Sequence, residues 1–105
     1  MAIKPRINSN NSGDVTYGQN VVLSIISLAT CEIKGVVGLV GKGVRTETVS
    51  DTINVEVYIN VAFGSSCSDV AYRVQENIKR SVETATSFKV GVVNVNILGV
   101  TFEDA

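Results

Sequence analysis

The chain has 105 residues, no histidine, two cysteines, and nine basic against ten acidic side chains, for a net charge of −1. The length suits one domain that buries roughly 60 to 70 per cent of its unfolded surface. The missing histidine excludes Ser-His and Cys-His nucleophile pairs and most zinc sites, and the near-neutral charge disfavours nucleic acid as the main partner. No catalytic residue, metal ligand or cofactor is therefore expected.

The ends of the chain set the expected domain limits. Residues 1–12 are expected to form a disordered polar tail, and residues 13–105 a single domain. The longest apolar run, residues 21–29, is interrupted by Ser24 and Ser27 and is far shorter than the roughly 20 residues of a membrane span. The first residues lack the apolar core of a signal peptide. We therefore expect a cytoplasmic protein with reduced cysteines.

Residues 14–17 are a candidate first strand, and the first helix is expected over residues 20–32. Its β-branched composition would also suit a strand, but the spacing of its small and polar residues follows the helical period and favours a helix. A stripe of small or polar residues recurs at helical spacing: Asn20, Ser24, Ser27 and Cys31. Two interpretations stay open, a helix buried in the core of its own domain, or one that also contacts another chain through this stripe.

Four glycines punctuate residues 35–43, with Lys42 among them and Arg45 just after. A Walker A phosphate loop is excluded because Val36 stands where its first glycine belongs and Gly43 follows Lys42. Residues 38–41 match the G-x-x-G of KH-type RNA binders, which makes Lys42 and Arg45 weak candidate RNA contacts. That loop joins two helices, whereas this segment leads from a helix towards a strand. The competing interpretation is that the glycines allow turns and close chain approach.

A hairpin is predicted next. Residues 44–49 form a moderate strand, Ser50 and Asp51 a tight turn, and residues 52–63 a strand with strict alternation of apolar and polar side chains. One row is expected to face the core: Ile53, Val55, Val57, Ile59, Val61 and Phe63.

The second helix is predicted over residues 66–86, with Ser66 as its cap and Asp69 near its positive end. Its apolar side is formed by Val70, Ala71, Val74, Ile78, Val82 and Ala85. Two acid-before-base pairs four residues apart, Asp69 with Arg73 and Glu76 with Arg80, lie on its solvent side.

The last strand begins near Val93, and a break in its alternation at Leu98 and Gly99 predicts a bulge. The element order is therefore β-α-β-β-α-β. It predicts a two-layer α+β sandwich, with two helices on a mainly antiparallel sheet of three or four strands. The strands on either side of the second helix are candidates for a parallel pair.

Isolated polar side chains give no catalytic site. Glu56, Glu76 and Glu83 are expected on solvated faces. Cys67 lies in a first helical turn, where a thiolate can be stabilised, but a packed thiol is the preferred interpretation because no histidine can activate it. Gln75 is interpreted as a solvated side chain, with a bond to a partner backbone as the alternative.

Four blocks resemble the alkaline shock protein family of Gram-positive bacteria, also called envelope stress response proteins. They are EIKGVVGL at 32–39, YINVAFG at 58–64, VA and VQ at 70–71 and 74–75, and VNVNILGV at 93–100. The blocks follow the family's order and spacing over residues 13–102. Two positions depart from it: the family often has an acidic residue where Gln19 and Asn20 stand, and a glycine where Ser87 stands.

The resemblance implies a non-catalytic cytoplasmic protein of envelope stress or homeostasis. Some members of that family lie beneath the membrane, held by a membrane-anchored partner, and others are encoded beside a fatty-acid kinase. We therefore expect a homo-oligomer that docks to a membrane-anchored or lipid-metabolism partner, with Asn20, Ser24, Ser27 and Cys31 as the candidate interface. A KH-like RNA-binding module is the alternative, and a small hydrolase is the third function considered.

Overall fold

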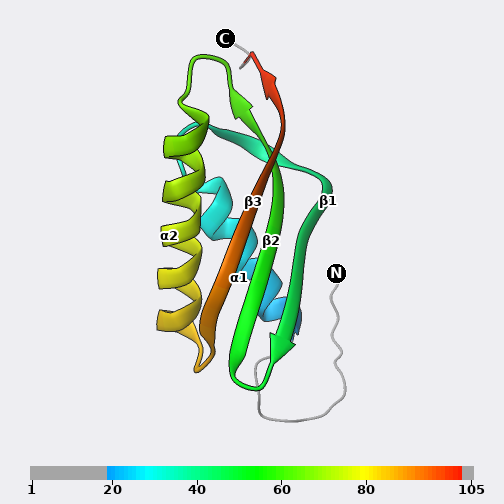
Figure 1. The fold of residues 1–105 in the computed structure, drawn as a ribbon, viewed down its shortest axis with the longest axis vertical. Coiled ribbons are helices and arrows are strands. Elements are labelled where there is room, and N and C mark those ends of the chain that lie inside the picture. Colours follow the sequence, from blue (N-terminus) through cyan, green and yellow to red (C-terminus); the bar gives the residue numbers. More distant parts are fainter. Residues whose placement is uncertain (1–18, 103–105) are drawn as a thin grey trace.

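Strict alternation of apolar and polar residues makes β2 (Thr52–Ala62) the central strand of the sheet. The computed structural model describes residues 19–102, and β2 is flanked there by β1 (Val36–Val49) and β3 (Lys89–Thr101). The helices α1 (Gln19–Cys31) and α2 (Cys67–Ala85) pack against one face of this sheet, as Figure 1 shows. The described elements leave the other face open.

The sheet is mixed. β1 and β2 form the predicted antiparallel hairpin, and its turn contains Ser50 with a φ of 58°. β2 and β3 run parallel and are joined by the α2 crossover. The α+β class and the parallel pair are confirmed, but only one of the two strand pairs is antiparallel. The candidate first strand, residues 14–17, and the predicted tail, residues 1–12, lie outside the described residues.

The core lies between the sheet and the two helices. The alternating row of β2 is at most 2% exposed and comprises Ile53, Val55, Val57, Ile59 and Val61. The helices cover it with Val22, Ile26 and Ala29 from α1 and Val70, Val74, Ile78 and Val82 from α2. Full burial of a valine or isoleucine contributes about 1.5–3 kcal/mol, so this row is a main source of stability.

Phe63 does not belong to that row, and the prediction that placed it there was wrong. β2 ends at Ala62, and Phe63 is 65% exposed. The Phe63 backbone N–H donates to the Thr101 carbonyl over 2.7 Å, and its ring stacks on Phe102 with the ring centroids 4.6 Å apart. Alternation in the sequence continues one residue beyond the strand, so it cannot show where the strand leaves the core.

The glycine segment belongs to β1. The predicted strand, residues 44–49, is only the second half of β1. The ladder with β2 shifts register between Leu39 and Val44, where Gly41 and Gly43 have positive φ angles of 58° and 70°. These glycines form an irregular bend inside a strand, which sequence reasoning interpreted as a turn before it.

Close chain approach is confirmed at Gly35. Its φ is 103°, and a β-carbon there would lie 2.8 Å from Cγ2 of Val70. The loop after α1 can therefore pass close against α2 only with glycine at this position.

The bulge predicted in the last strand is confirmed. Ile97 pairs with Ile59 and Gly99 with Asn60, so Leu98 is the extra residue on β3. A second register shift, between Ile53 and Val55 of β2, was not predicted.

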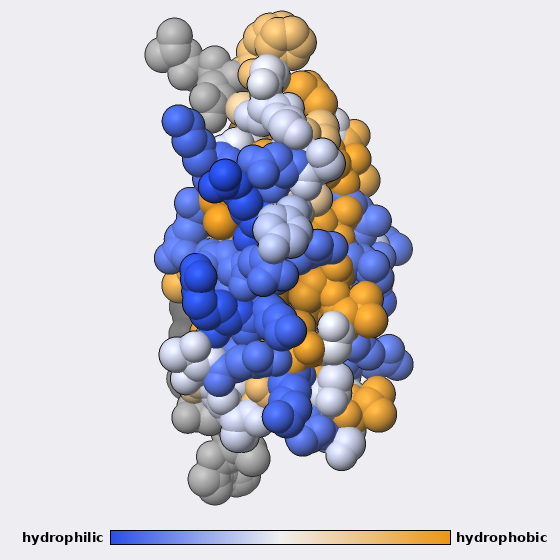
Figure 2. Space-filling model, turned by 60° about the vertical axis from the view of Figure 1, so that its left-hand side comes forward, coloured by the Kyte–Doolittle hydropathy of each residue, from blue (hydrophilic) through white to orange (hydrophobic). Residues whose placement is uncertain are grey.

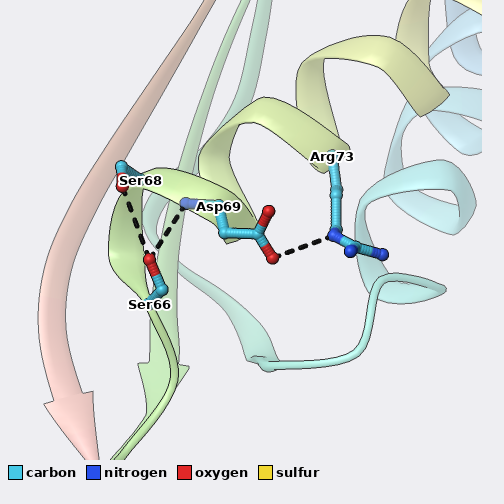
Figure 3. A network of polar contacts seen from close by, with 4 residues as sticks. All are labelled: Ser66, Ser68, Asp69 and Arg73. Atoms are coloured by element: carbon cyan, nitrogen blue, oxygen red, sulfur yellow. Dashed lines mark hydrogen bonds and ion pairs between the residues drawn. The ribbon is translucent and has the colours of Figure 1, made fainter.

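The start of α2 matches its prediction (Figure 3). The Ser66 hydroxyl accepts a hydrogen bond from the Asp69 N–H over 3.3 Å, and Arg73 Nε lies 2.9 Å from Asp69 Oδ2. The other predicted pair, Glu76 with Arg80, is replaced by a different contact, since Arg80 Nη2 donates to Asn77 Oδ1 over 2.8 Å.

The end of α2 needs no left-handed glycine. Thr86 is extended, with a φ of −134°, and its hydroxyl donates to the Val82 carbonyl over 2.8 Å. The same hydroxyl accepts the Phe88 N–H over 3.1 Å. Thr86 therefore ends the helix one residue before Ser87, the position where the family often has glycine.

Candidate interaction surface

The small-residue stripe of α1 lies on the side of the helix that faces away from the core. Asn20, Ser24 and Cys31 are exposed, and Ser27 is half-buried. The opposite side is buried and comprises Val22, Ile26, Ala29 and Thr30. The structure therefore brings the four predicted residues together on one side of α1, while their contact with another chain stays a prediction.

Two apolar side chains widen this surface. Leu28 is 67% exposed and Val21 is 46% exposed, and no residue of α1 is charged. A helix side facing water usually carries charged residues, so an uncharged side with an exposed leucine suits contact with another apolar surface. We define the α1 face as Asn20, Val21, Ser24, Ser27, Leu28 and Cys31.

An open groove of about 420 Å³ between α1 and α2 borders the α1 face. Its apolar lining comprises Ile25, Leu28, Ala29 and Ala85, and its polar lining Glu32, Arg80, Ser81 and Thr84. Leu28 belongs to both the face and the groove, so a partner side chain that packs on Leu28 can also enter the groove.

A buried asparagine links the two helices beside this groove. Asn77 is 7% exposed, and its Nδ2 donates to the Ala29 carbonyl over 2.8 Å and to Glu32 Oε1 over 2.9 Å. Its Oδ1 accepts from Arg80 Nη2. Sequence reasoning missed Asn77; the available signal was a polar residue directly before the core residue Ile78 of a strongly amphipathic helix. The network fixes α2 against the C-terminal turn of α1.

Two side chains of α2 bond the backbone of β3. Gln75 Nε2 donates to the Val93 carbonyl over 3.0 Å, so the interpretation of Gln75 as solvated was wrong. Glu83 Oε2 accepts the Val90 N–H over 2.8 Å, although Glu83 was expected to be only solvated. Both bonds connect residues that sequence spacing alone could not pair.

The open face of the sheet carries a polar cluster around Glu56. Asn96 Nδ2 donates to Glu56 Oε2 over 3.3 Å. Partial desolvation, and then the neighbouring Glu56 carboxylate, raise the pKa of the Tyr58 phenol. An open hollow of about 390 Å³ lies beside this cluster, lined in part by Arg45, Asn54 and Asn94. Glu56 lies on the opposite side of the sheet from Glu83 and Glu76, so it is not paired with either of these carboxylates.

The candidate RNA contacts lie in β1. Lys42 is exposed in the irregular bend, and Arg45 is exposed opposite Glu56. Residues 38–41 lie within β1 and do not join two helices, so the KH arrangement is not formed.

Both cysteines are free and exposed. Cys67 is the first residue of α2. The interpretation of Cys67 as a packed thiol was therefore wrong, because Cys67 lies on the exposed side of the first turn of α2, whose core residue is Val70.

Two further properties apply to residues 19–102. No three His, Cys, Asp or Glu side chains gather there as metal ligands. None of the helices in that range is both long and apolar enough to cross a membrane.

The sequence model of a family with a described cell envelope-related function, the alkaline shock protein 23 family, matches residues 39–102. The uncharacterized protein YqhY of Bacillus subtilis (strain 168) is 33% identical over 107 residues, covering 87% of this chain and 79% of YqhY. The chain belongs to the alkaline shock protein 23 family. The uncharacterized protein YloU of the same strain is 24% identical over 106 residues, covering 84% of this chain and 88% of YloU. The family resemblance predicted from the four sequence blocks is confirmed.

Solved structures share the fold of this family member at low sequence identity. A MamM CTD variant with two substitutions is 16% identical, with a TM-score of 0.63 over 82% of this chain and 95% of that one. A nickel form of MamM CTD is 18% identical, with a TM-score of 0.56 over 77% of this chain and 98% of that one. These likenesses support the α+β arrangement of two helices and three strands.

Proposed function

We propose that this chain is a non-catalytic interaction protein of the cell envelope stress response, which self-associates and docks to a protein partner through the α1 face. The observation that carries the proposal is the uncharged surface of α1, where Leu28 is 67% exposed beside a groove of about 420 Å³. Small side chains such as Ser24 let a second backbone approach closely, and Leu28 supplies an apolar anchor.

The chemistry of the surface defines the partner. A fitting partner presents an apolar side chain to the groove and small or uncharged residues to the α1 face. The α1 face is uncharged, and among the described residues the only charged ones that line the groove are Glu32 and Arg80. Under this proposal the partner is membrane-anchored or belongs to lipid metabolism. With a membrane-anchored partner, the chain would act at the inner face of the membrane without entering it.

A non-catalytic role rests on the side chains themselves. The sequence contains no histidine. Glu83 bonds a β3 N–H, and Glu56 bonds Asn96 on the other side of the sheet. These carboxylates hold the fold together and are not paired for acid-base chemistry.

The test introduces a charge at the centre of the face. We expect Leu28→Glu and Ser24→Glu to lower the average mass in light scattering at hundreds of micromolar, with an unchanged circular dichroism spectrum, because both side chains are exposed. Val49→Glu is the matched control, since Val49 is 57% exposed at the end of β1 and does not belong to the α1 face. An effect of Val49→Glu as large as that of Leu28→Glu would contradict the assignment.

The same variants test partner docking. Leu28→Glu used as bait in native extract should lose a partner that the unmodified chain and Val49→Glu both retain. Saturable binding of mixed RNA with a steep salt dependence, lost on changing Lys42 and Arg45 to Glu, would instead favour an RNA-binding function.

A further inference from the structure

β3 is an edge strand, and α2 shields only its first half. β2 is its neighbour on one side, and no described strand lies on the other (Figure 1). On that free side, Glu83 accepts the Val90 N–H over 2.8 Å and Gln75 donates to the Val93 carbonyl over 3.0 Å. Side chains of α2 therefore occupy edge positions that another strand would need.

The second half of β3 lacks such shielding. Backbone groups on one side of a strand recur at every second residue. Because the backbone carbonyl of Val93 faces the free edge, Val95 and Ile97 present their N–H and C=O groups to the same side. Among the described residues, these groups have no hydrogen-bond partner on that side. Such a row of unpaired groups is a template for another strand.

Two of the usual protections of an edge, charge and proline, are missing there, and the remaining one is the bulge at Leu98. Natural edge strands carry charges or proline, but residues 90–102 contain neither. Val100 is 51% exposed and Phe102 is 76% exposed, and Figure 2 shows hydrophobic surface over β3 beside the charged side of α2. In contrast, β1 at the other edge carries Lys42, Arg45 and Glu47.

We propose that two copies of this chain pair through the second half of β3, antiparallel and about a two-fold axis, so that their sheets become continuous. A second copy fits this edge because the two facing strand segments are both uncharged, so there is no like-charge repulsion between them. The half-buried side chains of Val95 and Ile97 would cover their counterparts and extend the apolar layer under the sheet. Gln75 and Glu83 confine the pairing to the second half of the strand and so restrict its register.

This surface is independent of the α1 face. A pairing over half a strand buries less than the roughly 800 Å² per partner of a typical stable complex. We therefore expect a weak dimer, with a dissociation constant in the micromolar range. Because the proposal goes beyond docking through α1, the test uses a chain in which the α1 face carries a charge.

The test is sedimentation equilibrium of Leu28→Glu. We expect a reversible dimer of twice the 11.1 kDa chain mass. Adding Val100→Lys should weaken it at least tenfold, and adding Val49→Lys should leave it unchanged, because Val49 is similarly exposed (57% against 51%) but lies on β1. Val95→Pro is the second variant and should also weaken the dimer. It removes an edge-facing N–H and leaves the ladder to β2 intact.

Hydrogen exchange locates the contact. The amides of Val95 and Ile97 should exchange more slowly as the concentration of Leu28→Glu rises. A monomer at hundreds of micromolar would overturn the β3 proposal and leave the α1 proposal standing. A dimer without protection of these amides, or one weakened equally by Val49→Lys, would overturn it as well. If instead Leu28→Glu has the same mass and the same bound partners as the unmodified chain, the α1 proposal fails and the β3 proposal stands.

Discussion

The side-chain oxygen of Asn54 occupies the space that a β-carbon on Gly91 would need. An added β-carbon would lie 2.5 Å from Asn54 Oδ1 and 3.0 Å from Cγ2 of Thr52. The same oxygen accepts the Val92 N–H over 2.9 Å, at the register shift between β2 and β3. This contact therefore lies where the register of β3 against β2 changes, just before the edge-facing carbonyl of Val93.

Gly91→Ala should destabilise the fold by about 1–2 kcal/mol, because Asn54 must move and give up its bond to Val92. Urea unfolding followed by circular dichroism measures this loss. Gly38→Ala is the control, since nothing lies within 4 Å of its added β-carbon. Equal effects of the two substitutions would show that the Asn54 contact is not required.

Asn77→Ala should cost about 1–3 kcal/mol, because it leaves the buried Ala29 carbonyl without its donor. The same denaturation measurement applies. Glu32→Gln should be nearly neutral because it keeps an acceptor for Asn77, and Lys79→Ala, on the exposed side of α2, should also be neutral. If Asn77→Ala matched Lys79→Ala in stability, the proposed link between the helices would be unimportant.

Ser66→Ala should cost about 1 kcal/mol, because the N-terminal end of α2 loses the side chain that caps it. Thermal unfolding monitored at a helix-sensitive wavelength tests this. Ser68→Ala is the matched control, since the Ser68 hydroxyl contacts Ser66 but does not cap the helix. A cap has no role here if both variants melt together.

Alkaline pH should reveal the environment of Tyr58. Its pKa is raised above the ordinary value of 10.0. The contribution of the neutral phenol to stability is therefore complete below about pH 10 and is lost as the pH rises through the folded-state pKa. In a urea series across this range, Tyr58→Phe should lose less stability than the unmodified chain. Tyr72→Phe, at an exposed position, should follow the unmodified chain.

The sequence predicted elements whose signals are local. Alternation in β2, the Ser66 cap and the bulge at Leu98 depend on neighbouring residues, and all three are found. The sequence did not predict that the glycine segment continues β1. A strand with positive φ at Gly41 and Gly43 is maintained by pairing with β2, which local propensity does not encode.

Polar partners distant in sequence were not predictable in the same way. Asn77 bonds Ala29, 48 residues away, and Gln75 bonds Val93, 18 residues away. Both side chains lie on a helix whose pattern assigns polar residues to solvent. Only the packing of α2 against α1 and β3 brings these donors to their acceptors. The α1 stripe was visible in the sequence because it depends only on helical spacing, whereas the exposure of Leu28 beside it required the fold.

The two free thiols allow the most direct test of the α1 face as an interaction surface. Cys31 lies on the α1 face, and Cys67 lies at the start of α2, so each chain carries a probe and an internal reference. Alkylation rates of both thiols are measured by mass spectrometry from micromolar to hundreds of micromolar chain. We predict that alkylation of Cys31 slows as the chain associates, relative to alkylation of Cys67, and that Leu28→Glu removes this slowing. A constant Cys31 rate over a range in which the mass of the unmodified chain rises above that of Leu28→Glu would contradict it.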